Sequence, residues 1–231
     1  FALFMAIVTV LGGIAAARYE MAIMLPESQR DAEMLAWLSG AVASLFSLLL
    51  FILCLLWGAE IANLLRAPTL VGVLPWLPLA VWLLTLGAIF SALASRSRHF
   101  SSVARANVLK SVGVSGTQVG AGFANLGVTG LIAGNLLGAV VFIGGLCRSV
   151  NGRRDGARPT RSELARLASR YKDFPKYSLW ATLANGISVN VLSFLLSTFY
   201  SLAALGFYNL VQRVLAAPSA VLGSAIGQVF Y

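Results

Sequence analysis

Residues 35–57 read LAWLSGAVASLFSLLLFILCLLW and contain no charged side chain. As an α-helix, these 23 residues would extend for about 34 Å, slightly more than the roughly 30 Å hydrocarbon core of a bilayer. This stretch therefore predicts a transmembrane helix, and the chain around it is expected to be a membrane protein.

The same pattern repeats along the 231-residue chain, of which 58% is hydrophobic and only 11% charged. A soluble domain usually carries about 25% charged residues, so the composition excludes a water-soluble enzyme domain of the ordinary kind. We expect an all-α, polytopic transmembrane helix bundle with about seven membrane helices. The predicted spans are 1–17, 35–57, 73–94, 105–125, 129–147, 178–200 and 203–231.

Two of the charge-free runs are too long for one crossing and must contain turns. Asn125 and Gly127 tolerate a positive φ, so they predict a hairpin within the run 111–147. A second turn is expected near Tyr200 and Ser201. Pro75 and Pro78 fall near the start of the third span, where a missing backbone donor costs least.

The basic residues are distributed unevenly between the connections. Fifteen of the 17 Lys and Arg residues fall in connections 18–34, 95–110 and 148–176, and the opposite connections hold only Arg66. By the positive-inside rule, the basic connections are expected to face the cytoplasm. The net charge of +9 is then a topology signal, and no nucleic-acid partner is expected.

Connection 148–177 separates two groups of predicted spans, 1–147 and 178–231. Thr160 and Glu163 form a capping-box pattern that begins a short helix. One face of this helix is apolar and the rest carries Arg and Lys, so we expect it in the cytoplasmic interface beside anionic lipids. A topology-fixing linker and a contact with an anionic substrate head group are the alternatives. The apolar face holds Leu164, Leu167, Ala168 and Tyr171.

Arg213 is the first candidate for a functional cation, because it stands alone in the stretch 177–231. An Arg at bilayer depth costs roughly 2.5–3.5 kcal/mol on insertion scales. We therefore expect it to line a substrate cavity or to anchor neighbouring helices by hydrogen bonds.

Arg18 and Glu20, with Tyr19 between them, are the next candidates. If the first helix continues to Leu25, both charges lie at the membrane edge. Because residues two apart on a helix do not face each other, each charge would then need its own partner or a wet cavity.

Arg105 and Lys110 are expected to begin the fourth span at its cytoplasmic end. They could form the mouth of the same cavity, although snorkelling to the interface is the simpler interpretation.

Signatures of enzymatic chemistry are scarce. His99 is the only histidine, and no glycine-rich phosphate loop or acidic metal motif is present. Cys54 and Cys147 are predicted on opposite sides of the membrane, too far apart for a disulfide. We expect no catalytic residue, no metal and no cofactor.

Several stretches resemble the bacterial lipid-linked oligosaccharide flippases of the O-antigen type, within the MOP exporter superfamily of polysaccharide biosynthesis proteins. The resemblance covers nearly the whole chain and preserves order and spacing. The stretches are FALF at 1–4, RYEMAIMLP at 18–26, YKDFPKYS at 171–178, GFYNLVQRVL at 206–215 and GSAIGQVF at 223–230.

The resemblance implies two helical lobes around a cavity that opens alternately to either side. The chain would hold N-lobe helices in 1–147 without the first, a basic linker at 148–177, and the first two C-lobe helices at 178–231. Because both ends lie in apolar runs, we expect a piece of a longer protein.

The implied substrate is an undecaprenyl-pyrophosphate-linked oligosaccharide for O-antigen, capsule or exopolysaccharide synthesis. It would cross the bacterial inner membrane, with glycan-assembly proteins as possible partners. The diphosphate would meet Arg213, Arg18 and Arg105, with Lys110, Glu20 and Tyr19 nearby.

Three alternatives remain open. A multidrug antiporter of the same superfamily would prefer buried acids, which the apolar runs lack. A membrane-embedded glycan-assembly enzyme would need a large periplasmic loop or an acidic metal motif. A scaffold for glycan assembly would lack a charged cavity.

Overall fold

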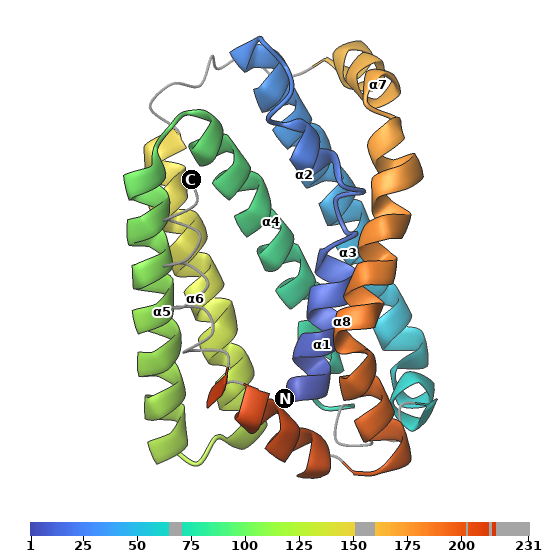
Figure 1. The fold of residues 1–231 in the computed structure, drawn as a ribbon, viewed down its shortest axis with the longest axis vertical. Coiled ribbons are helices and arrows are strands. Elements are labelled where there is room, and N and C mark those ends of the chain that lie inside the picture. Colours follow the sequence, from blue (N-terminus) through green and yellow to red (C-terminus); the bar gives the residue numbers. More distant parts are fainter. Residues whose placement is uncertain (65–70, 151–159, 202, 213, 216–231) are drawn as a thin grey trace.

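The computed structural model describes residues 1–64, 71–150, 160–201, 203–212 and 214–215. In this part of the chain the regular structure is entirely helical, which confirms the predicted all-α bundle. The long helices run roughly along the long axis of the molecule, with α7 at one end (Figure 1). The elements are α1 (Ala2–Gly12), α2 (Tyr19–Ala22), α3 (Gln29–Leu64), η2 (Leu74–Trp76), α4 (Leu77–Arg96), α5 (Phe100–Phe123), α6 (Gly127–Val150), α7 (Arg161–Arg170), η4 (Phe174–Ser178), α8 (Leu179–Phe199) and a further helical stretch over 203–212.

Four of the described helices are long and apolar enough to cross a membrane, and the predicted number of seven is not confirmed. They are Gln29–Gly58, Leu74–Arg96, Gly127–Arg148 and Phe174–Phe199. Helix α5 has 24 residues but is less apolar, since it carries Arg105 and Lys110 among many small polar residues.

The predicted turns are confirmed. Asn125 has φ 54° and Gly127 has φ 56°, so both residues adopt the left-handed conformation that closes the α5–α6 hairpin. Helix α8 ends at Phe199, and the Ser201 hydroxyl accepts a hydrogen bond from the Ala204 N–H at the start of the next helical stretch.

The first predicted span, 1–17, is wrong as a single helix, because α1 ends at Gly12. The glycines at 12 and 13 weaken the helix and permit close packing. A Cβ atom at Gly12 would lie 2.5 Å from the Leu84 side chain on α4, and one at Gly13 would lie 3.2 Å from Thr182 on α8. The proposed continuation to Leu25 is also wrong, since Ala17 and Arg18 have φ values of 50° and 64°.

Helices α5 and α6 pack closely through small residues. A Cβ atom at Gly130 would lie 2.5 Å from that of Ala121, and one at Gly134 would lie 2.8 Å from the Gln118 side chain. At Gly138, a Cβ atom would meet Val114. Glycines at a spacing of four residues thus form the α6 surface that approaches α5, as is common where membrane helices meet.

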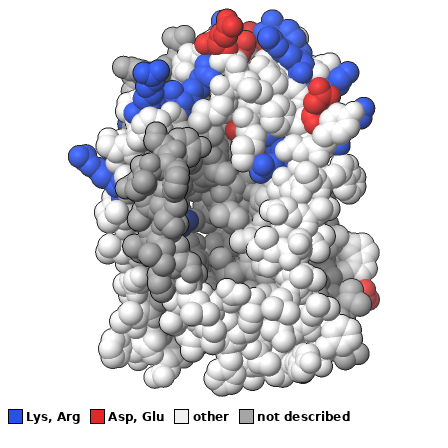
Figure 2. All heavy atoms as spheres, viewed as in Figure 1, with Lys and Arg blue, Asp and Glu red and all other residues white. Residues whose placement is uncertain are grey.

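The charged residues gather at one end of the molecule. Figure 2 shows Lys, Arg, Asp and Glu mainly at the end that carries α7, and very few elsewhere on this face. We call this the charged end. Two apolar clusters fill the interior: one around Leu3, Phe4 and Val81, and one nearer the charged end around Ile23, Leu35 and Leu167.

Candidate functional site

Arg18 and Glu20 form an ion pair with 3.2 Å between Nη1 and Oε1. The sequence argument that these residues cannot face each other assumed a helix, and it is wrong because Arg18 is left-handed, at φ 64° and ψ 11°. Arg18 Nε also lies 3.5 Å from the Ser178 hydroxyl, to which it donates. Arg18 therefore joins α2 to the start of α8.

Glu20 is buried, with 8% of the residue exposed. Among the described residues it is the only charged one that is buried, and its Oε2 atom has no hydrogen-bond partner. Glu20 lies in α2, outside the candidate spans. Burial raises the pKa of its carboxyl, and the backbone hydrogen bond and Arg18 oppose this shift.

Tyr19, predicted to lie near the substrate, contacts α7 in the structure. Its hydroxyl donates to the backbone oxygen of Ala168 on α7, at 3.3 Å. Burial raises the pKa of this phenol above its ordinary value. Tyr19 thus links α2 to α7 by a hydrogen bond.

Lys110 lies deeper than the sequence suggested. Helix α5 begins at Phe100, so Lys110 is about 15 Å along the helix and does not begin it. Its Nζ atom lies 5.3 Å from the centre of the Phe142 ring on α6. Arg105, one turn and a half nearer the charged end, is exposed.

Lys110 also lines a cavity of about 70 Å³ between α1, α4, α5 and α6. Most of the other lining residues are apolar, and Asn135 of α6 is the other strongly polar one. Within the described residues, no acidic side chain forms an ion pair with Lys110. The remaining lining residues are Phe4, Met5, Val8, Ala80, Leu84, Ile132, Leu136 and Ala139.

The structure places these candidates in two groups. Arg18, Tyr19 and Glu20 lie together where α2 meets α7 and α8, whereas Lys110 lies between α5 and α6. Arg213 lies outside the described residues, so its predicted role stays a prediction.

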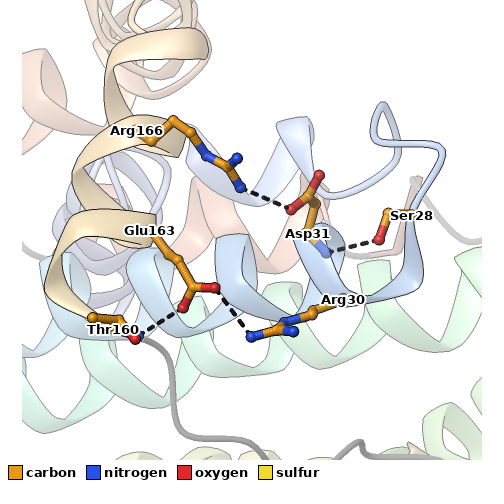
Figure 3. Close-up of polar contacts among 6 residues, drawn as sticks. All are labelled: Ser28, Arg30, Asp31, Thr160, Glu163 and Arg166. Atoms are coloured by element: carbon orange, nitrogen blue, oxygen red, sulfur yellow. Dashed lines mark hydrogen bonds and ion pairs between the residues drawn. The ribbon is translucent and has the colours of Figure 1, made fainter.

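Helix α7 is held against the start of α3 by two ion pairs (Figure 3). Arg30 contacts Glu163 at 3.0 Å, and Arg166 contacts Asp31 at 3.6 Å. The predicted capping box between Thr160 and Glu163 is present. The hydrogen bond from the Thr160 backbone holds the pKa of the Glu163 carboxyl below its usual range.

The apolar face of α7 is covered by protein. Leu167 is only 1% exposed, and Leu164, Ala168 and Tyr171 pack against the same apolar cluster, to which α2, α3 and α4 contribute side chains. The sequence suggested that this face enters the membrane interface. It cannot do so in the structure, because protein side chains cover it.

Arg96 was counted from the sequence only as a topology signal, but it organises the loop before α3. Its guanidinium donates to four backbone oxygens and to the Gln29 side chain, at 3.2–3.4 Å. Its position in the last turn of a helix was the available signal, because Arg at such a place can hydrogen-bond nearby carbonyls. The four oxygens belong to Ile23, Met24, Glu27 and Ser28.

The described residues contain no group of three or more His, Cys, Asp or Glu side chains able to hold a metal ion. Cys54 and Cys147 are not joined by a disulfide. The Arg18 group and the Lys110 group each contain a cationic hydrogen-bond donor in largely apolar surroundings.

The sequence model of one family, described as polysaccharide biosynthesis proteins, matches residues 2–231. No curated protein and no solved structure gives a significant match. With nearly its whole length matched, the chain belongs to the polysaccharide biosynthesis protein family.

Proposed function

We propose that this protein flips a polyprenyl-pyrophosphate-linked oligosaccharide across the bacterial inner membrane by alternating access. Family membership supports a role in polysaccharide synthesis or transport, and the four long apolar helices support a place in a membrane. Flipping makes and breaks no covalent bond, so the protein needs cations and a cavity but no catalytic group.

The observation that carries the proposal is Lys110. An ammonium at bilayer depth is costly unless it faces a cavity or a counter-charge. Lys110 faces a cavity, and within the described part of the chain its recorded side-chain contact is the Phe142 ring. A diphosphate supplies the missing negative charge through charge-assisted hydrogen bonds.

Arg18 extends the same chemistry toward the charged end. It can exchange Glu20 for a phosphate oxygen, because its pairing with Glu20 is a single contact and leaves other guanidinium donors available. The charged end would face the cytoplasm, where positive charge accumulates in membrane proteins. The substrate head would therefore enter past Arg18 and proceed toward Lys110.

The multidrug antiporter is less well supported. A site for cationic drugs needs an acid free to bind them, and Glu20, the buried acid of the described part, already pairs with Arg18. An anionic ligand fits this pairing better, because it can compete with Glu20 for the Arg18 guanidinium.

The test is a translocation assay with the full chain reconstituted in vesicles that contain a fluorescent polyprenyl-pyrophosphate oligosaccharide. Lys110→Gln should reduce the flipping rate at least tenfold, and Lys110→Arg should retain most of it. Arg98→Gln is the matched control, because it removes the same charge from an exposed position just before α5.

Equal flipping by wild type and Lys110→Gln, with equal thermal midpoints, would contradict the proposal. A wild-type protein that flips no lipid-linked oligosaccharide but exports a cationic dye would favour the antiporter.

A further inference from the structure

The segment that joins α7 to α8 carries cations that take no part in the ion pairs between α7 and α3. Glu163 and Arg166 are paired with Arg30 and Asp31 of α3. Lys172 and Lys176, which follow α7, are exposed, and neither forms an ion pair with a described acidic residue.

Lys172 and Lys176 lie one helical turn apart. The Lys176 N–H donates to the Lys172 oxygen at 3.2 Å, so the two side chains emerge on the same side of the segment. Trp180 follows at the same spacing, beyond the π-helical turn η4, and is 65% exposed. The three residues thus form a row of two cations and one indole, which we call the Lys-Lys-Trp row.

Aromatic residues beside the row indicate its depth in a bilayer. The candidate span Phe174–Phe199 begins within this segment. Tyr177, 62% exposed, and Trp180 lie in its first turns, where membrane helices concentrate Tyr and Trp at the level of the lipid head groups. Lys172 and Lys176 therefore lie at or just outside that level, within reach of lipid phosphates.

We propose that the Lys-Lys-Trp row binds the head group of an anionic phospholipid. This surface differs from the apolar face of α7, which is covered by protein, and it does not depend on the proposed substrate. Asp173 is exposed between the two lysines and lies three residues before Lys176, but it forms an ion pair with neither lysine. Lys176 Nζ lies 5.1 Å from the Tyr177 ring centre, a weak contact that leaves its donors available to phosphate.

A lipid fits better than an acidic protein, because the exposed side chains that follow the row on α8 are apolar. Ile187, Val191 and Leu195 are 43–46% exposed. An acyl chain can lie along them below a head group held by the lysines, whereas an acidic protein surface gains nothing from them.

The test uses the full chain, purified in detergent, freed of lipid, and titrated with dioleoylphosphatidylglycerol or dioleoylphosphatidylcholine. Native mass spectrometry gives the fraction of protein with bound lipid. Each lysine near an anionic surface contributes about fivefold, so Lys172→Gln/Lys176→Gln should weaken phosphatidylglycerol binding roughly 25-fold. Phosphatidylcholine binding should not change.

The matched control is Arg98→Gln/Arg161→Gln, which removes two exposed cations elsewhere at the charged end. It should retain phosphatidylglycerol binding within about threefold, and Lys172→Arg/Lys176→Arg should bind as the wild type does. An equal loss in the control, or wild-type binding by the Gln variant, would overturn the proposal.

Two soluble competitors distinguish the sources of negative charge. Inorganic phosphate or poly-glutamate, at millimolar concentration, should displace little phosphatidylglycerol, because neither offers an acyl chain. Complete displacement by phosphate would indicate a small-anion site, and complete displacement by poly-glutamate would indicate a protein partner. Either result would overturn the assignment to lipid.

Discussion

Arg18 adopts the left-handed conformation and pairs through its guanidinium with Glu20, and the two side chains are only 18% and 9% exposed. Removing one partner of such a pair leaves a charge in a poorly solvated site. We expect Arg18→Gln to destabilise the protein by about 2–3 kcal/mol, and Arg18→Gln/Glu20→Gln to recover more than half of that loss. Thermal unfolding in detergent measures this, and a double variant no more stable than Arg18→Gln would contradict it.

The same pair predicts a pH dependence. Burial raises the pKa of the Glu20 carboxyl above its ordinary value. A group with a raised folded-state pKa stabilises the protein below its unfolded pKa, and this contribution is lost as the pH rises through the folded value. Between pH 4 and pH 8, Glu20→Gln should therefore show a smaller fall in thermal midpoint than the wild type. Identical pH profiles of the two proteins would show that Glu20 does not contribute to the pH dependence of stability.

Arg96 should not be replaceable by Lys. Its planar guanidinium binds four backbone oxygens of the loop before α3 and the Gln29 side chain at the start of α3, and an ammonium cannot reach all of them. We expect Arg96→Lys to cost about 1–2 kcal/mol, since several of these contacts are exposed. Arg98→Lys, two residues later and with no such contacts among the described residues, is the control in the same unfolding assay.

The ion pairs of α7 should be weak and sensitive to salt, because they are partly exposed. A charge reversal at one partner, Asp31→Arg or Arg166→Asp, should cost at most about 1 kcal/mol, and combining both should restore stability. The restored part should shrink in 1 M salt, where the screening length falls to about 3 Å. A coupling energy independent of salt would mean that the contact is not electrostatic.

Glycines on α6 allow a direct test of the α5–α6 packing. Gly138→Ala places a methyl group against Val114, so we expect a loss of about 1–3 kcal/mol. Gly144 lies on the same helix with no atom within 4 Å of an added Cβ, so Gly144→Ala should stabilise the helix by about 0.5–1 kcal/mol. Equal effects at both positions would contradict the close packing.

The sequence predicted those features that depend on local chemistry. The backbone preferences of Asn125 and Gly127 predict their turn, and Thr160 with Glu163 predicts a helix start within four residues. The end of α1 was missed because Gly12 and Gly13 lie within a continuous apolar run, where hydropathy alone indicates a longer helix.

Contacts between distant segments were not predictable in the same way. The Arg18–Glu20 pair requires a positive φ that no residue type at 17 or 18 signals, since neither is glycine. For α7, the spacing of Leu164 and Leu167 identified an apolar face, but periodicity cannot tell whether lipid or protein covers it. The depth of Lys110 depended on where α5 begins, which is the least certain property of a predicted helix.

The early end of α1 also bears on the order in which the protein can be assembled. Gly12 exposes a helix-terminal carbonyl within the bundle, and the Thr85 hydroxyl of α4 lies 3.3 Å from it, at a separation of 73 residues. That hydroxyl is 2.8 Å from the Val81 oxygen of its own helix as well, so its proton is shared between the two acceptors. During synthesis, α1 emerges long before α4 does. Its last turn can therefore take its final form only after the helix that supplies Thr85 has entered the membrane.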